Sequence, residues 1–151
     1  MSASRALALG AISGLRSLSG PAFVSHGHLD LEGTPLAFLG SPRLSKALVL
    51  MALGELVGDK LSITPSRTSP PVLLWRAVSG GLVGGASFVS EGRRATRGVV
   101  LGSSSAIAAA IAGERLRDLA GRKTGLPDPL LALAEDAVVL VVGFRLLSDV
   151  R

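Results

Sequence analysis

Apolar residues along this chain fall into five long stretches, separated by shorter segments that are rich in Gly, Pro and charge. Each stretch is long enough for several helical turns and too long for an ordinary strand, so the pattern predicts an all-α fold. The predicted helices cover about 4–18, 42–61, 71–90, 96–120 and 129–147. No change in composition separates them, which predicts a single domain over residues 1–151.

Pro and capping residues set the predicted helix ends. Ser41-Pro42 and Asp128-Pro129 each place a capping side chain before a Pro at the first helical position. Gly20-Pro21 predicts the end of the first helix. The segment that follows is broken by Gly and Pro, so we expect an ordered loop there, with a short interfacial or re-entrant piece around Pro35–Leu39.

The predicted helices lack the polar stripe of a soluble surface helix. Residues 98–113 carry no charge, and 129–144 are apolar all round apart from Glu135 and Asp136. A membrane span needs about 20 mostly apolar residues, a length that these segments approach. Charges nevertheless interrupt every segment, so we expect the ionisable side chains to face the inside of a polytopic membrane helix bundle.

The composition favours the same architecture. The chain is 48% hydrophobic but only 3% aromatic, contains 19 Gly, and has a mean hydropathy of +0.50. Small residues let helices approach closely in lipid, and G-x-x-x-G pairs mark such contacts. The pairs within the predicted helices are Gly10/Gly14, Gly54/Gly58, Gly80/Gly84, Gly81/Gly85 and Gly98/Gly102.

The net charge of +5 comes from short basic clusters between the apolar runs. These clusters are not interleaved with aromatic residues, which favours the lipid bilayer as the partner and argues against nucleic acid. The absence of Cys excludes a disulfide framework, a thiolate nucleophile and a Cys-based metal site. The basic, apolar N-terminus resembles a presequence, but Arg16 interrupts it and no cleavage site follows, so a retained first membrane helix is favoured.

Two acidic pairs lie within apolar helices. Glu55 and Asp59 are four residues apart and share one helix face. A carboxylate in hydrocarbon needs a partner, and we expect Glu55 and Glu135 to meet Arg16 and Arg76 in the bundle interior. The network is either structural, fixing helix register, or a path for protons or cations. Its candidate members are Arg16, Glu55, Asp59, Arg76, Glu135 and Asp136.

Two short segments recur in the same order along the chain. Residues 12–16 are echoed by 111–115, and 52–55 are echoed by 132–135. With one helix between the copies, this predicts an inverted two-helix repeat of the kind found in transporters, with coincidence in an Ala- and Leu-rich chain as the alternative. If the first helix crosses the membrane once, the Lys and Arg outside the network divide seven against seven, which predicts no orientation.

Residues 54–86, "GELVGDKLSITPSRTSPPVLLWRAVSGGLVGGA", resemble the signature of domain-of-unknown-function family 4126, a family of small bacterial integral membrane proteins. Residues 13–22, 31–42 and 113–138 are also similar to it, so the resemblance covers nearly the whole chain. It implies a multi-pass protein of the bacterial inner membrane, a cell-membrane localisation, and no particular substrate. The most specific part is a signature loop that contains Lys60, Thr64, Pro65, Ser66 and Arg67.

Two functional hypotheses follow. The first is a small transporter or channel for an ion or small solute, with the acidic pairs as the coupling site. The alternative is a non-transporting scaffold or accessory subunit whose charges are structural. A chain this short would need a homo-oligomer to form a wide pathway.

No enzyme activity is expected, because no nucleophile stands beside a base. The hydroxyls of Ser103, Ser104 and Ser105 are expected to bond helix backbone. His26 and His28 have the H-x-H spacing of a metal site but are more simply explained as exposed loop residues. No nucleotide-binding or zinc-protease fingerprint occurs, so we predict no catalytic residue, metal or cofactor.

Overall fold

The computed structural model describes residues 2–27, 29–58 and 68–148. Over these ranges the chain is all-α and contains no strand, which confirms the predicted helical content. The elements are α1 (Ser2–Leu15), α2 (Ser19–His26), the short 3₁₀ helix η1 (Ala37–Gly40), α3 (Pro42–Gly58), α4 (Pro70–Val89), α5 (Ala95–Thr124) and α6 (Asp128–Ser148). Five of these correspond to the predicted helices, and α2 is additional.

The first predicted boundary is wrong. The chain breaks after Leu15, and Gly20-Pro21 lies inside the first turn of α2 instead of ending the helix before it. Pro is tolerated in a first turn because its missing N–H has no partner within the helix there. The short piece predicted around Pro35–Leu39 overlaps η1, whereas the predicted end of the second helix at residue 61 lies outside the described residues.

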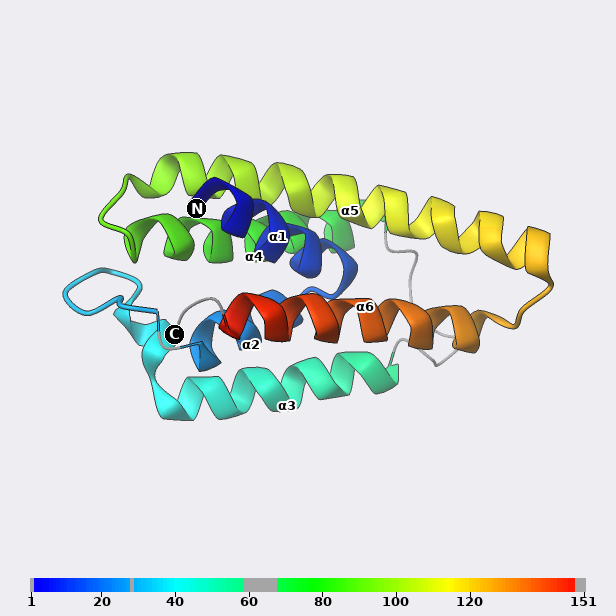
Figure 1. The fold of residues 1–151 in the computed structure, drawn as a ribbon, viewed down its shortest axis with the longest axis horizontal. Helices are drawn as coiled ribbons and strands as arrows, with labels where there is room; N and C mark the ends of the chain where they lie inside the picture. The colour runs from blue at the N-terminus through cyan, green and yellow to red at the C-terminus, as the bar shows by residue number, and fades with distance from the viewer. Residues whose placement is uncertain (1, 28, 59–67, 149–151) are drawn as a thin grey trace.

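The helices run lengthwise through an elongated bundle (Figure 1). We call the end where α1 begins and α6 finishes the termini end, and the end with the α5–α6 connection the loop end. From the termini end, α1 runs to the middle of the bundle and α2 returns, so the two form a hairpin. α3 and α5 then run towards the loop end, and α4 and α6 run back.

This topology contradicts the predicted inverted repeat. α1 and α3 run in the same direction, whereas α5 and α6, their supposed copies, run antiparallel (Figure 1). No single rotation relates the two pairs, so the short sequence echoes are coincidental. The topology also places Arg5 at the termini end. The predicted division of seven basic residues against seven therefore no longer holds.

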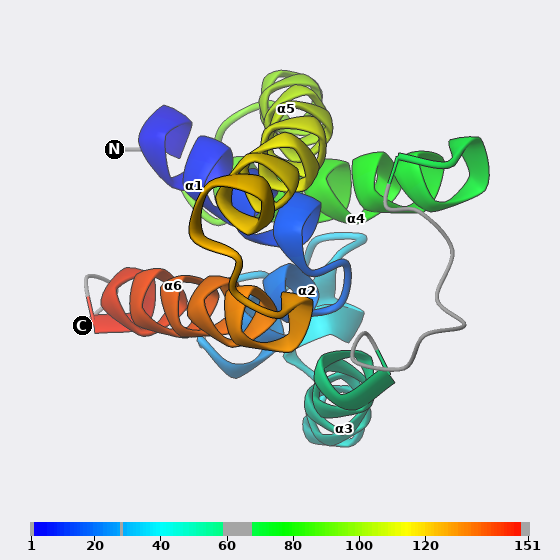
Figure 2. The same cartoon turned by 90° about the vertical axis from the view of Figure 1, so that its right-hand side faces the viewer.

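Helices α1, α4 and α5 form what we call the glycine-packed half (Figure 2). A Cβ on Gly84 would meet the Gly98 carbonyl, and one on Gly10 would meet the Gly102 carbonyl. Backbone therefore packs against backbone, as the G-x-x-x-G pairs of these three helices predicted. The Gly54/Gly58 pair is an exception, because no atom of the described residues lies within 4 Å of a Cβ built on either glycine.

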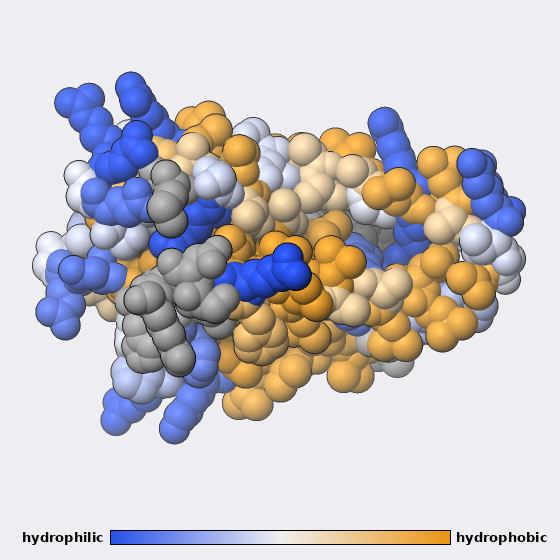
Figure 3. Space-filling view, viewed as in Figure 1, coloured by the Kyte–Doolittle hydropathy of each residue, from blue (hydrophilic) through white to orange (hydrophobic). Residues whose placement is uncertain are grey.

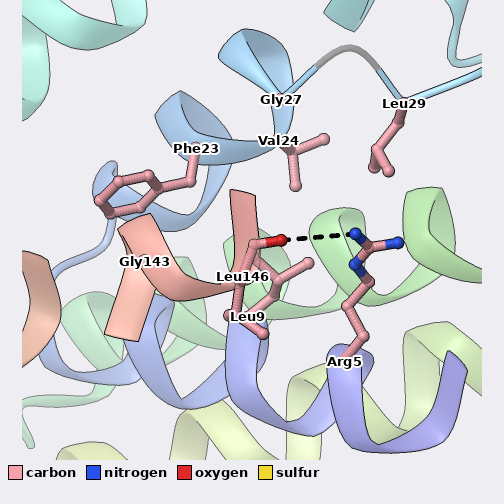
Figure 4. Close-up of a pocket in the computed structure, with 8 residues that line it drawn as sticks. All are labelled: Arg5, Leu9, Phe23, Val24, Gly27, Leu29, Gly143 and Leu146. Atoms are coloured by element: carbon pink, nitrogen blue, oxygen red, sulfur yellow. Dashed lines mark hydrogen bonds between the residues drawn. The ribbon is translucent and has the colours of Figure 1, made fainter. Parts of the chain in front are cut away.

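Helices α2, α3 and α6 form the open half. α3 packs mainly against α2 and η1, and α2 lies between α3 and α6 (Figure 2). At the termini end, α1, α2 and α6 close around a small pocket (Figure 4). There the Arg5 guanidinium donates to the Leu146 carbonyl at 3.4 Å, a favourable place for a cation near a helix C-terminus. The Phe23 ring lies against Gly143 and meets Phe144 edge to face at 5.6 Å.

The face of the bundle seen in Figure 3 is mostly apolar between two polar ends. Large exposed side chains on the four long helices include Leu50, Leu53, Val57, Leu74, Val100, Val138, Val141 and Phe144. Within the described part of the chain, α4 and α5 are long and apolar enough to span a membrane.

Candidate functional site at the break between α1 and α2

The α1–α2 hairpin turns in the middle of the bundle, where residues 16–18 interrupt the helix. Such a break leaves carbonyls at the end of α1 and N–H groups at the start of α2 without partners inside a helix. Away from water each of these groups needs another partner. Side chains from α3 and α4 supply them.

Arg76 of α4 binds the end of α1. Its Nη1 donates to the Gly14 carbonyl and, at 2.7 Å, to the Leu15 carbonyl. The residue is only 3% exposed, so its positive charge is held inside the protein at the negative end of the α1 dipole. One helical turn further along α4, the Ser79 hydroxyl donates to the Ser17 carbonyl.

Glu55 of α3 binds the start of α2. One carboxylate oxygen accepts the Ser17 N–H at 2.8 Å, and the other accepts the Leu18 N–H at 2.9 Å. A carboxylate at a helix N-terminus is stabilised both by these bonds and by the helix dipole. Glu55 and Arg76 therefore occupy opposite sides of the same break, each facing the helix end that suits its charge.

Arg16, the first residue of the break, pairs with Asp136 of α6. Nε donates at 2.8 Å and Nη2 approaches at 2.5 Å, both to the same carboxylate oxygen. Arg16 is fully buried and Asp136 is 5% exposed. We call Arg16, Glu55, Arg76 and Asp136 the break cluster. Its two cations and two anions give it no net formal charge.

A second ion pair lies nearer the loop end. Arg117 of α5 contacts Glu135 at 2.8 Å and Asp128 at 3.6 Å. The Arg117 and Glu135 side chains are 16% and 13% exposed. They line a cavity of about 300 Å³ between α5 and α6, whose wall also includes Leu15, the residue just before the break. We call it the loop-end cavity; a hollow at this end is visible in Figure 3.

A larger cavity of about 650 Å³ lies at the termini end. It is bordered by the last turn of α2, the η1 region and the start of α3, and its charged lining consists of His26, Asp30, Glu32 and Lys46. We call it the termini-end cavity. The short helix α2 thus separates it from the break cluster.

The structure brings most of the predicted network together, with one change of partner. Arg16, Glu55 and Arg76 meet at the break, but Asp136 joins them in place of Glu135. Neighbouring residues on a helix point about 100° apart, so only one acid of the α6 pair can face Arg16. Predicted site residues outside the described ranges are Asp59, Lys60, Thr64, Pro65, Ser66 and Arg67.

Two residues of the site were not predicted. Ser79 lies three residues after Arg76, on the same helix face, and that spacing is a usable signal. Arg117 lies in a strongly charged segment that resembles a solvated helix, so nothing in the sequence singles it out.

The three Ser hydroxyls on α5 all bond backbone, as predicted. Ser104 donates to the Leu101 carbonyl in its own helix. Ser103 and Ser105 instead reach the Ala77 carbonyl of α4 and the Leu7 carbonyl of α1. Among the described residues no cluster of three potential metal ligands occurs, and His28 lies outside them.

Comparison with known proteins gives no match: no protein-family model, no curated protein and no solved structure matches this chain. The function is therefore inferred from the fold and the site.

Proposed function

We propose that this is an integral membrane protein in which α3 to α6 cross the bilayer and the α1–α2 hairpin enters and leaves on one side. The length and apolar character of α4 and α5 support crossing. On α6, Glu135 and Asp136 both turn to arginines inside the bundle, which keeps these two charges off its outer face. The family resemblance would place the protein in a bacterial inner membrane.

The hairpin is re-entrant in this proposal. Its helices contain 14 and 8 residues, so at 1.5 Å per residue they rise only about 21 Å and 12 Å. A hydrocarbon core is about 30 Å thick, which neither can cross. Non-helical backbone at membrane depth is tolerated where it is buried in protein or lines a cavity, and the break is buried by Glu55 and Arg76.

We further propose that the protein moves a small ion or solute across the membrane, with the break cluster as the gate. The observation that carries this is the meeting of two half-helix ends, in the middle of the bundle, with buried or half-buried charges from three other helices. Half-helix ends and intramembrane charges recur at the sites of transporters. A network that only fixed helix register would need a single ion pair, whereas four ionisable residues meet at this one break.

The positions of the two cavities fit a closed gate. The loop-end cavity reaches Leu15 from one side, and the termini-end cavity reaches the last turn of α2 from the other. In this proposal a permeating ion or solute passes when the contacts at the break rearrange.

Glu55 is the best candidate for the coupling residue. Its two hydrogen bonds hold the start of α2, and both depend on an ionised carboxylate with two acceptor oxygens. A proton or a cation that bound Glu55 and neutralised its carboxylate would weaken these two hydrogen bonds. Release of α2 would then be linked to that binding event.

The test is flux into liposomes that contain the purified protein, a pH-sensitive dye and a panel of ions. We expect flux for at least one ion, and its loss in Glu55→Gln and Asp136→Asn. Glu91→Gln, an exposed carboxylate outside the cluster, is the matched control and should retain flux. Each variant is first shown to be folded by gel filtration and thermal melting. Retained flux in a folded Glu55→Gln would reject the gating role.

The competing proposal is a non-transporting scaffold or accessory subunit. The charge balance of the break cluster favours it, because paired charges fix helix register without conducting. No flux for any ion tested, together with wild-type cellular behaviour of Glu55→Gln, would favour the scaffold.

A further inference from the structure

An apolar groove runs along the open half of the bundle. Its volume is about 270 Å³, and α2 forms the floor with small residues such as Ala22, while α3 contributes Leu53 and α6 contributes Phe144. The Leu53 and Phe144 side chains are 53% and 61% exposed, so the groove opens onto the apolar outer surface. We call it the α2 groove.

The α2 groove meets the termini-end cavity at His26, which lines both. The apolar groove thus adjoins, at this side chain, a space lined by one Lys, one His and two carboxylates, those of Asp30 and Glu32. All four side chains are exposed. In the described part of the chain they form no ion pair with one another, although both signs of charge border the same cavity.

We propose that this continuous surface binds one membrane phospholipid whose headgroup carries a primary amine. One acyl chain lies in the α2 groove, the phosphate faces Lys46 and His26, and the ammonium donates to Asp30 and Glu32. The proposal rests on membrane insertion, as set out above, but not on transport.

Charge complementarity favours this occupant. A zwitterionic headgroup with a hydrogen-bonding ammonium matches a cavity that offers a cation for phosphate and carboxylates for the amine. A headgroup with only negative charge would be repelled by the two carboxylates. A trimethylated amine has no N–H to donate to them.

The experiment is native mass spectrometry of the detergent-solubilised protein, titrated with phosphatidylethanolamine, phosphatidylglycerol and phosphatidylcholine of identical acyl chains. We expect the first to bind about tenfold more tightly than the other two, the difference that one charge-assisted hydrogen bond supplies. In the double variant Asp30→Asn/Glu32→Gln this preference should vanish. Glu91→Gln/Asp118→Asn, which changes two exposed carboxylates elsewhere, should keep it.

A second pair of variants tests the groove. Leu53→Trp places a large side chain in it and should weaken binding of all three lipids. Leu50→Trp makes the same change on the same helix, at a residue that is 68% exposed and outside the groove lining, and should bind like wild type.

Equal binding of the three lipids, a preference that survives the double carboxylate variant, or unchanged binding by Leu53→Trp would each overturn the proposal. Alkaline extraction of membranes separates this failure from that of the proposed function. A protein released by carbonate would refute membrane insertion itself, whereas one that stays in the membrane and shows no lipid preference would refute only the lipid site.

Discussion

The two halves of this bundle are held together in opposite ways. In the glycine-packed half, α1, α4 and α5 approach until backbone meets backbone, with Gly102 lying against Gly80 and Gly10. In the open half, α3 rests mainly on the short helix α2, and a groove separates it from α6. The break cluster lies between the halves and ties α1 to α3, α4 and α6. One half is therefore suited to act as a rigid frame, and the other to hold ligands and to move.

The strongest test of this difference replaces one glycine of a G-x-x-x-G pair by Val in each half. Gly102→Val adds a side chain whose Cβ alone would overlap the Gly80 carbonyl. We expect loss of folding, a larger effect than the roughly 1–3 kcal/mol typical of overpacking, because backbone cannot move aside as a flexible side chain can. Gly54→Val meets nothing within 4 Å and should melt close to wild type. Gel filtration and thermal melting in detergent measure both, and equal behaviour of the two variants would contradict the division into halves.

The next largest effect is expected at the ion pair that joins the halves. Asp136→Ala leaves the buried Arg16 guanidinium without its carboxylate, with an expected cost of about 3–5 kcal/mol. Replacing both partners with apolar residues, as in Arg16→Met/Asp136→Leu, should recover part of that loss, because no buried charge is then left behind. A double variant that is no more stable than Asp136→Ala would show that Arg16 contributes through packing or other contacts.

How far the sequence predicts this site depends on the kind of residue. Arg16, Arg76, Glu55 and Asp136 were predictable, because a charge inside an apolar helix must turn inwards to a partner. The pairing was not, because it depends on the break after Leu15, and Gly20-Pro21 indicated a later helix end. The G-x-x-x-G pattern likewise predicted contacts in three helices but also marked Gly54/Gly58, where no helix approaches. A motif shows that close approach is possible, whereas the neighbouring helix decides whether it occurs.

A smaller effect is expected at Glu55. Glu55 was expected to pair with an arginine. In the structure its carboxylate instead accepts hydrogen bonds from the Ser17 and Leu18 N–H groups. Glu55→Ala leaves both donors without this acceptor, and a buried unsatisfied donor costs about 1–3 kcal/mol. Glu55→Gln keeps one acceptor oxygen and should cost less. Thermal melting should therefore rank wild type above Glu55→Gln and Glu55→Gln above Glu55→Ala, and a wild-type melting temperature for Glu55→Ala would mean that the start of α2 is held by other groups.

The smallest expected effect concerns the orientation of the protein in the membrane. The described Lys and Arg number seven at the termini end, namely Arg5, Arg43, Lys46, Arg93, Arg94, Arg97 and Arg145. Four lie in the last third of α5, towards the loop end: Arg115, Arg117, Arg122 and Lys123. By position in the sequence, Arg151 follows α6 while Lys60 and Arg67 follow α3, so the totals become eight against six.

An excess of two basic residues favours a cytoplasmic termini end, because positive flanks are retained inside. A C-terminal green fluorescent protein should therefore fluoresce, and an alkaline phosphatase at the same position should stay inactive. Arg93→Gln/Arg94→Gln/Arg97→Gln lowers the count at this end from eight to five, below the six at the loop end, and should produce both orientations in one population. An active phosphatase on the wild-type chain would reverse the assignment. The re-entrant hairpin would then enter from the outside, since it begins and ends at the termini end.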